Sequence, residues 1–316
     1  MKIFIYILKK LITLVPVLFA ISLMAFLLGV AAPGDPAYFA LIANGTTDPT
    51  ESELLDMRIE LGLDRPIHVR YISWLCNALH GNFGKSFYDN RPVGKEILHR
   101  FPITVYLSLL SLVVTFIGGV GSGLLMAKYP NSILDRFGQL TALTFISVPG
   151  FWLAILLIGI FSEYLRWLPT SGIGTLSHMI MPAFVLSAGT MGLTIRLSRG
   201  SLLEEMHKQY IITAKSKGLE EGTILLFHGF PNALIPIVTL LGTYWGNILG
   251  GAVIVESIFS IPGIGQYAIT AIMNRDFPVV QAYVLLTGTI FVFMNLIIDL
   301  FYILINPKIR ISGSLE

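Results

Sequence analysis

Histidine, cysteine and carboxylate side chains are the groups of this chain that could bind a metal ion or transfer a proton. The single cysteine, Cys76, excludes a disulfide within the chain and any metal site built on several thiolates. None of the histidines stands at the paired spacing of metal ligands, and no nucleophile is spaced to work with a base. The sequence therefore predicts no metal site and no catalytic residues. The six histidines are His68, His80, His99, His178, His207 and His228.

The segment Gly81–Ser86, with the letters GNFGKS, shares part of the pattern of an ATP-binding phosphate loop. That pattern requires a glycine five residues before Gly84, and Leu79 stands there. ATP binding by this chain is therefore not expected.

Asp299 is the one carboxylate placed squarely within a long apolar segment. A charged group at membrane depth is costly, and such a residue is by default a candidate for function. It stands one to two helical turns before the end of the segment, which favours a structural ion pair with an interfacial Arg or Lys. The alternative is a proton relay in a transporter driven by an ion gradient.

A charged segment between two long apolar segments is the strongest candidate for a binding surface. Ser201 and Glu204 have the spacing of a capping box and predict the start of a helix. Lys215 and Lys217 fall in its last turn, where cations suit the helix dipole, and Gly218 supplies a left-handed stop.

This predicted helix has one apolar face and one charged face, because four residues recur at helical spacing. Such a helix could lie on the membrane surface. It could equally dock into a partner protein, with a small residue on its buried face allowing a close approach. The four residues are Leu203, Met206, Tyr210 and Ala214.

Composition places the chain among all-α integral membrane proteins. Hydrophobic residues make up 54% of the 316 residues and charged residues only 13%. A membrane span needs roughly 20 apolar residues, and only helices satisfy the backbone of such a segment in lipid. Gly119 and Gly123 are typical of closely packed helices. Six runs without Asp, Glu, Lys or Arg predict six transmembrane helices, with the true spans shorter than the runs: Leu11–Ala32, Phe101–Ala127, Phe137–Ser162, Trp167–Ile195, Gly222–Val255 and Phe277–Ile298.

Lysine and arginine residues gather on one side of the predicted spans. If the N-terminus is cytoplasmic, the two short loops on the other side hold only Arg166 and Arg275. Both termini and the charged helix are therefore expected in the cytoplasm. The run Leu11–Ala32 exceeds the apolar region of a signal peptide, about 7–15 residues, which favours an uncleaved first span. The basic residues on the cytoplasmic side are Lys2, Lys9, Lys10, Lys128, Arg136, Arg196, Arg199, Lys208, Lys215, Lys217, Lys308 and Arg310.

The long external region, residues 33–100, could fold into a small subdomain. Thr50 and Glu53 predict a capping box that opens a helix ended by Gly62. Pro66 is placed in the first turn of a second helix. The region either covers the spans or offers a landing surface to an extracytoplasmic substrate-binding protein. The expected buried stripe of the second helix is Ile67, Tyr71, Trp74, Leu75 and Leu79.

The charged helix resembles the EAA loop of ABC-importer permeases, in the variant carried by the peptide/nickel branch. The resemblance rests on YIITAKSKGL, residues Tyr210 to Leu219, in which Ala214 and Gly218 match. Thr213 and Lys215 stand where the eponymous Glu and second Ala would be. The resemblance implies docking onto an ATPase subunit through Tyr210, Thr213, Ala214, Lys215, Lys217, Gly218 and Leu219.

Further motifs resemble the peptide/nickel permease family in the same order over nearly the whole chain. Each is weak alone, and their common order is specific. In the family, Asp is commoner than Asn at the position of Asn306. The motifs are Ala32–Ala37, Leu61–Pro66, Gly81–Ser86 with Arg91–Val93, Val148–Leu153, Ile261–Gly265, Asn274–Gln281 and Asn306–Arg310.

The resemblance implies the first of two permease subunits of an ATP-driven importer, with a type I permease core. A homologous second permease would complete a heterodimer. Two cytoplasmic ATPases, which hold ATP and Mg²⁺, and an extracytoplasmic binding protein complete the importer; this chain binds no cofactor or nucleic acid. The implied regions are 1–32 (N-terminus and first span), 33–100 (extracytoplasmic loop), 101–306 (five-helix core with a coupling loop at 198–230) and 307–316 (cytoplasmic tail).

The cargo remains open between nickel, free or chelated, and di- or oligopeptides. Four features resemble nickel-type permeases, but peptide permeases share most of them. An ion-coupled secondary transporter using Asp299 explains the hydropathy without explaining the charged helix. An intramembrane enzyme lacks a spaced catalytic pair. The four features are Phe161–Pro169, His178–Ala183, Trp74 and Gln266–Asp276.

Overall fold

The computed structural model describes residues 2–31, 33–250 and 252–305 of the chain. These residues lie in helices and connecting segments, with one isolated bridge between Lys85 and Pro92. The predicted tail 307–316 and the Asn306–Arg310 motif lie outside the described residues. The predicted division of the chain at residues 32, 100 and 306 stays a prediction.

The chain separates into two units by its internal contacts. Unit 1 runs to Thr104 and adds Leu249–Ser257 and Pro262–Phe293; unit 2 comprises Val105–Ile248, Ile258–Ile261 and the chain from Met294 onward. The helices of unit 1 are α1 (Lys2–Ala31), α2 (Pro36–Ala43), α3 (Glu51–Glu60), α4 (Ile67–Leu79), the start of α5 (Val93–Thr115), most of α13 (Val253–Ile258), α14 (Ile264–Met273) and the first part of α15 (Phe277–Ile305). Those of unit 2 are the rest of α5, η1 (Phe116–Val120), α6 (Gly121–Lys128), α7 (Ile133–Ser147), α8 (Gly150–Leu157), η2 (Ile158–Tyr164), α9 (Leu176–Met206), α10 (Gln209–Ser216), α11 (Glu221–Ile224), η3 (Leu225–Gly229) and α12 (Phe230–Leu249).

Within the described residues, five helical segments are long and apolar enough to cross a membrane, and a bent pair makes a sixth. This confirms the all-α membrane class, and the predicted number of six spans is reached when the bent pair is counted as one span. The five segments are Ile12–Ala31, Val93–Lys128, Leu176–Met206, Glu221–Leu249 and Phe277–Ile298.

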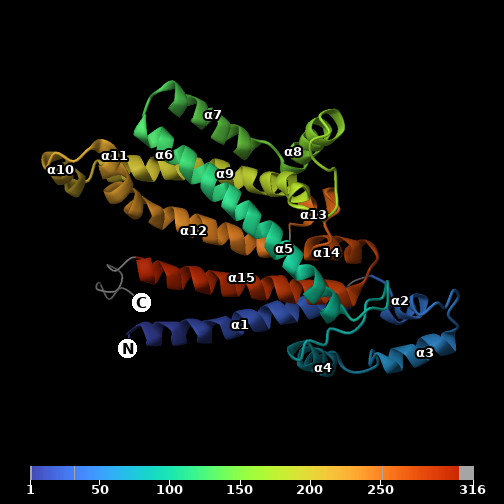
Figure 1. Cartoon of the computed structure of the whole chain (residues 1–316). Coiled ribbons are helices and arrows are strands. Elements are labelled where there is room, and N and C mark those ends of the chain that lie inside the picture. The colour runs from blue at the N-terminus through green and yellow to red at the C-terminus, as the bar shows by residue number, and fades with distance from the viewer. Residues whose placement is uncertain (1, 32, 251, 306–316) are drawn as a thin grey trace. The chain divides into compact units, whose positions relative to one another are not determined.

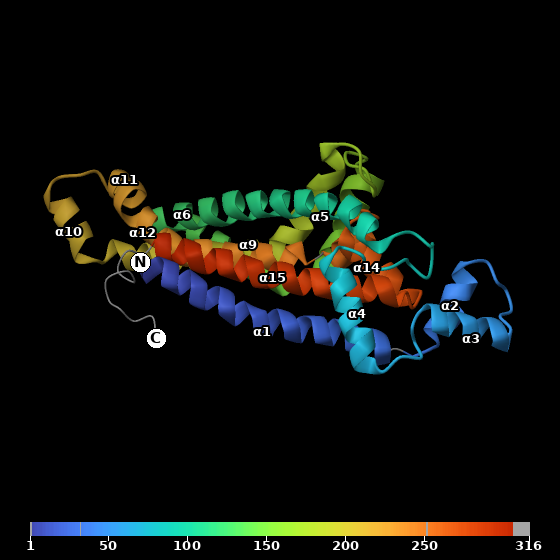
Figure 2. The same cartoon turned by 90° about the horizontal axis from the view of Figure 1, so that it is seen from below.

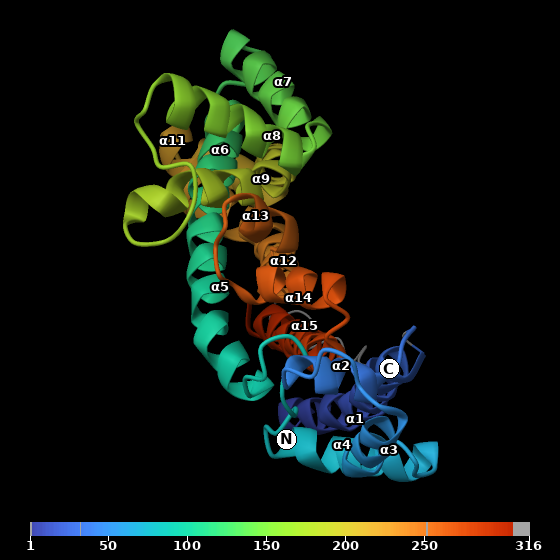
Figure 3. The ribbon, with the colours of Figure 1, turned by 90° about the vertical axis from the view of Figure 1, so that its right-hand side faces the viewer.

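The third predicted span is a broken helix rather than one straight segment. Ile133–Ser147 and Gly150–Tyr164 meet at a bend of 105° (Figure 3). Pro149 causes the break, because proline lacks an N–H donor and forces Val148 before it into an extended conformation (ψ 122°). The uncharged run 137–162 could not predict this bend, because the absence of charged residues does not determine the backbone geometry.

The helices of the fourth and fifth predicted spans leave part of their apolar runs uncovered, as expected. In the run from Trp167 the helix begins at Leu176, because the intervening segment holds Pro169 and two glycines with positive φ, Gly172 and Gly174. In the run to Val255 the helix ends at Leu249, and the short α13 follows it. An apolar run therefore marks a span without fixing its ends.

In the external region, the predicted capping box at the start of α3 is confirmed. Glu53 N donates to Thr50 Oγ1 (3.4 Å), and Thr50 N donates to Glu53 Oε2 (2.8 Å). Gly62 follows the end of this helix with a φ of +64°, as predicted.

Helix α4 lies beside the end of α1 (Figure 2) and departs from its prediction in two ways. Pro66 caps the helix from one residue before its first turn. The predicted stripe is only partly buried: Tyr71 is buried, whereas Ile67 and Leu79 are 55% and 78% exposed. Trp74 and Leu75 are half-buried.

The buried side of α4 is the side that faces α1. Tyr71 Oη and Ser22 Oγ share a hydrogen bond of 2.8 Å, and the ring of Tyr71 contacts that of Phe26 edge-on at 5.4 Å. Helical periodicity predicted an apolar stripe but could not tell which part of it the neighbouring helix covers.

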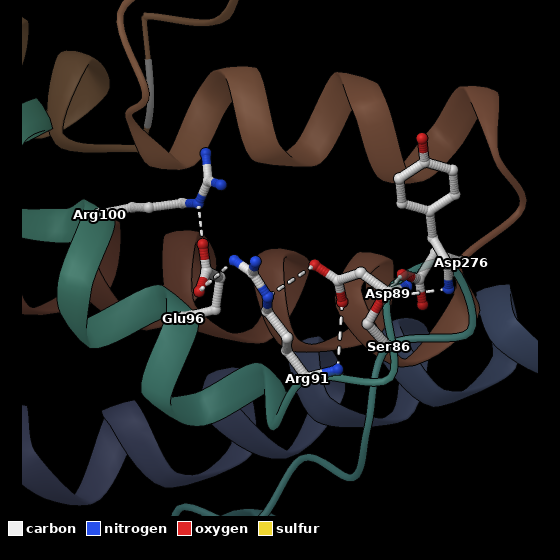
Figure 4. A network of polar contacts seen from close by, with 7 residues as sticks. Ser86, Asp89, Arg91, Glu96, Arg100 and Asp276 are labelled. Carbon is white, nitrogen blue, oxygen red and sulfur yellow. Dashed lines mark hydrogen bonds and ion pairs between the residues drawn. The ribbon is translucent and has the colours of Figure 1, made fainter. Parts of the chain in front are cut away.

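A polar network holds the segment before α5 against the start of α15 (Figure 4). The buried carboxylate of Asp276 accepts hydrogen bonds from Ser86 Oγ (2.5 Å) and Phe87 N (3.0 Å). Burial raises the pKa of Asp276. In the first turns of α5, Glu96 pairs with Arg100 (2.7 Å) and lies 3.9 Å from Arg91. The network joins parts of unit 1 that are far apart in sequence.

A second buried carboxylate, Glu256, organises the Ile261–Gly265 motif. It accepts hydrogen bonds from Thr104 Oγ1 (2.8 Å) and from Gln266 N (2.9 Å). A Cβ atom on Gly265 would lie 2.9 Å from the backbone of Val253, which explains why a glycine stands there. The motif is therefore a packing arrangement around a carboxylate with no exposed surface.

Close packing by Gly119 and Gly123, predicted from the sequence, is confirmed in unit 2. A Cβ on Gly119 would lie 2.7 Å from Thr194 Cβ, and one on Gly123 would lie 2.4 Å from Ser198 Cβ, both on α9. The two glycines therefore let the η1–α6 segment approach α9 closely.

We predict that Gly123→Ala destabilises the protein by about 1–3 kcal/mol, because the new methyl group overlaps Ser198. Gly121→Ala is the matched control in the same helix, since its Cβ would meet none of the described atoms within 4 Å. Thermal unfolding in detergent should give a lower Tm for Gly123→Ala and an equal or higher Tm for the control. Equal Tm values for both variants would contradict the packing argument.

Candidate functional site

The candidate site is a helical hairpin, α10 and α11, between α9 and the η3–α12 segment. In Figure 1 it lies at one end of α9 and α12. Helices α9 and α12 are among the apolar segments long enough to cross a membrane, alone or with η3 and α11. The hairpin therefore connects two predicted spans and contains all the residues that the sequence assigned to coupling.

The predicted start of this helix at Ser201 is wrong. Helix α9 continues without a break to Met206, so Ser201 and Glu204 lie inside it. No proline interrupts this stretch, so the backbone N–H groups there already bond within the helix and need no capping box. Helix α10 begins after Lys208, which makes no side-chain cap.

The predicted apolar stripe is therefore divided between two helices. Leu203 and Met206 belong to α9, whereas Tyr210 and Ala214 belong to α10. The inner face of the hairpin is a small apolar cluster of Ile211, Ala214 and Ile224, with Met206 packed against it. Ala214 is 5% exposed, in keeping with its predicted place on the buried face.

The predicted stop at Gly218 is confirmed, and its hydrogen bonds define a Schellman motif. Gly218 adopts a φ of +77°, and its N–H donates to Lys215 O (2.9 Å). Leu219 N–H donates to Ala214 O (3.4 Å), which closes the turn. Lys217 caps the helix through its own N–H, which donates to Ala214 O and Thr213 O (both 3.2 Å).

A buried carboxylate, Glu205 near the end of α9, holds the hairpin. It accepts hydrogen bonds from Lys208 Nζ and from Tyr210 Oη (2.5 Å). Asn232 Nδ2 of α12 donates to the same Tyr210 Oη (3.2 Å) and to His228 O (2.9 Å). These contacts tie α9, α10 and α12 together at one point.

The protonation states at this point are stable at neutral pH. Partial burial of the side chain is the main cause that raises the pKa of Tyr210 to about 12, and the hydrogen bond to Glu205 is the second. The hydrogen bond to Glu205 also raises the pKa of Lys208. Both groups therefore keep their protons and remain donors to the carboxylate.

The outer face of the hairpin is polar with a few exposed apolar side chains. Thr213, Lys215 and Lys217 are exposed, and Thr213 Oγ1 donates to Gln209 O within the helix (3.1 Å). Lys215 lies 3.6 Å from Glu221, an exposed ion pair that contributes little. Apolar surface is offered by Leu219 (41% exposed) and Ile212 (51%), and by Phe227 (73%) in the adjoining η3.

Residues 119–311 match the family described as binding-protein-dependent transport system inner membrane component. Residues 3–108 match the family that describes its N-terminal part. The chain belongs to this family. It is a multi-pass permease component of an ABC importer of the peptide/nickel type, in which ATP hydrolysis belongs to partner subunits.

Named relatives agree with this assignment. The glutathione transport system permease protein GsiC of Escherichia coli strain K12 is 39% identical over 305 residues, which cover 96% of this chain and 98% of that protein. GsiC of Shigella dysenteriae serotype 1 strain Sd197 matches with the same identity and coverage. An inward-facing structure of the MetNI methionine ABC transporter, CY5 native crystal form, is 17% identical with a TM-score of 0.56, over 66% of this chain and 96% of that chain. This likeness confirms the type I permease fold.

The sequence missed the residues that anchor the hairpin in this permease. Glu205 and Asn232 lie on either side of the hairpin, and their joint contact with Tyr210 is not local. The only local signal was the spacing of Glu205 and Lys208, which suits a pair three residues apart on a helix. Burial of Ile211 and Ile224 depends on the fold of the hairpin.

The backbone of Asp299 lies in α15, and its side chain lies outside the part of the structure that is described. Its structural or ion-coupling role therefore stays a prediction. Across the described ranges no group of three or more His, Cys, Asp or Glu side chains gathers where it could hold a metal. His178 lies in the first turn of α9, where its Nδ1 and Thr175 Oγ1 are 2.9 Å apart.

We predict that Tyr210→Phe loosens the hairpin, because Glu205 and Asn232 both lose a hydrogen-bond partner. A lost hydrogen bond to a charged group costs about 1–2 kcal/mol, which corresponds to roughly 5- to 30-fold faster local opening. Amide hydrogen exchange over residues 207–219 should report this change. Tyr164→Phe is the matched control, since Tyr164 is 84% exposed. Unchanged exchange in Tyr210→Phe would contradict the anchoring role.

Proposed function

We propose that this chain is the permease subunit of an importer for glutathione-sized peptides and that the α10–α11 hairpin couples it to the ATPase. The proposal of this cargo class is supported by the 39% identity with glutathione permeases over 96% of the chain. That match runs through both the core and the external region. Nickel, the other cargo class suggested by the sequence, serves as the comparison in the test below.

The geometry of the hairpin supports the coupling role. The hairpin is fixed to α9 and α12 through Glu205, Tyr210 and Asn232, so its displacement would move both helices. Its outer face leaves Ile212 and Leu219 exposed for a partner, and Phe227 in the adjoining η3 is exposed as well. ATP-driven closure of the partner would then bias the spans between outward and inward openings by differential affinity for the two states.

The proposed assembly contains a homologous second permease, two cytoplasmic ATPases and an extracytoplasmic binding protein. The Lys and Arg distribution of the sequence supports cytoplasmic termini and a cytoplasmic hairpin. ATP and Mg²⁺ are assigned to the ATPases, and this chain is proposed to bind no cofactor and to catalyse no reaction. The region 33–100 would face the binding protein.

We predict that glutathione or dipeptides, and not Ni²⁺, stimulate ATP hydrolysis severalfold in the complex purified through this chain and reconstituted in lipid. Each cargo is supplied with the cognate binding protein, and ATP turnover is measured with and without it. Stimulation by Ni²⁺ or its chelates alone would overturn the peptide assignment. Absence of any copurifying ATPase would contradict the proposed coupling role.

We also predict that Gly218→Arg abolishes uptake while leaving membrane insertion intact. The substitution places a long cation on the outer face of the hairpin and strains a φ of +77°. Gly45→Arg is the matched control, because Gly45 also has a positive φ (+96°) and open space around its Cβ, but lies in the external region. Uptake assays in cells should show loss only for Gly218→Arg; normal uptake in that variant would contradict the coupling assignment.

A further inference from the structure

A cavity of about 450 Å³ opens in unit 1, separate from the hairpin. It is bounded by the end of α1, by α4 and the turn before it, by residues 82–85 with Phe87, and by the start of α15. Nothing in the proposed coupling role uses it.

The charges that line this cavity are mostly positive. Arg65, Arg70 and Lys85 line it, against a single carboxylate, Glu60. In the part of the chain that the structure describes, the ion pairs of unit 1 engage other arginines, such as Arg58 with Asp35 (2.6 Å). The cavity therefore carries uncompensated positive charge and suits an anionic ligand.

The remaining lining is apolar and lies where two spans end. Phe26 belongs to the last part of the apolar segment Ile12–Ala31, and Phe277 begins the segment Phe277–Ile298. Gln281 Nε2 donates to Phe26 O (3.1 Å), which keeps these two ends together. A cavity at this depth lies at the boundary between hydrocarbon and water. Trp74, which also lines it, belongs to the residue type enriched at that boundary.

Helix α4 adds an observation that points to lipid. Its Tyr71 and Ala78 are buried, whereas Ile72 and Leu79 remain 58% and 78% exposed. The helix is therefore apolar on its packed side and also on an exposed side. Because it lies next to the end of a span, it suits the interfacial plane of a bilayer. The mouth of the cavity therefore lies beside a surface suited to acyl chains.

We propose that this cavity binds the head group of an anionic phospholipid. The leaflet is the one on the side of residues 33–92, which is extracytoplasmic in the orientation proposed above. Arg70 and Lys85 hold the phosphate. The planar guanidinium fork of Arg70 is well shaped for phosphate oxygens, Lys85 contributes an ammonium charge, and Arg65 adds to the positive field. The bound lipid braces α4 and residues 82–87, and Ser86 connects the latter to Asp276 before α15.

The test is a lipid titration of the intact complex by native mass spectrometry, with phosphatidylglycerol against phosphatidylcholine. We expect the double variant Arg70→Gln/Lys85→Gln to bind phosphatidylglycerol roughly 30-fold more weakly than the wild type, because two cations near the phosphate are removed. Arg166→Gln/Lys95→Gln removes the same charges from exposed positions outside the cavity and should bind as the wild type does. Lys85→Arg keeps the charge and should retain binding.

Four results would overturn the proposal. The first two are equal binding of phosphatidylglycerol and phosphatidylcholine, and equal losses in the double variant and its control. The other two are competition by soluble glycerol phosphate at the same concentration as the lipid, and absence of bound lipid in the wild-type complex. The same spectra report whether ATPase subunits are present, so a failure of the proposed function is seen separately.

Discussion

A buried carboxylate, Glu205, holds the α10–α11 hairpin against the helix that leads into it. Lys208 and Tyr210 donate to its two oxygens, and Asn232 brings in α12 through the same phenol. A carboxylate removed from water is stable only when such donors surround it. The rest of the coupling argument depends on this joint, because a loosely attached hairpin could not transmit a displacement to the spans.

Buried carboxylates also organise unit 1, although the helices they join differ. Asp276 receives hydrogen bonds from the segment before α5, and Glu256 receives them from Thr104 and the backbone of α14. In each case a buried acid accepts a hydrogen bond from a distant part of the chain, since Ser86 is 190 residues from Asp276 and Thr104 is 152 residues from Glu256. Each of these buried acids therefore joins segments that the sequence separates.

Much of the architecture could be predicted because it depends on local chemistry. Uncharged runs located the spans, the spacing of Thr50 and Glu53 located α3, and Gly218 located the end of α10. The prediction of a helix start at Ser201 failed because a capping box caps a helix only where the preceding residues are not helical. Here α9 continues through Ser201. Charge patterns likewise gave no warning of the bend at Pro149.

The anchors of the candidate site could not be predicted, because they join residues far apart in sequence. Tyr210 was chosen for its motif, but its partner Asn232 lies 22 residues later, and Ser86 and Asp276 are 190 residues apart. Such pairs form only when packing brings helices together. The sequence identified which segment binds, and the structure identified what holds that segment in place.

Site-specific crosslinking tests the coupling claim most directly. With Cys76 replaced by Ser, a cysteine at Ile212 on the outer face of α10 is compared with one at the more exposed Ile133, which begins α7. The account predicts a crosslink to the ATPase subunit from Ile212→Cys, with a yield that changes when ATP is added, and none from Ile133→Cys. No crosslink from Ile212→Cys, or equal yields from both positions, would contradict it.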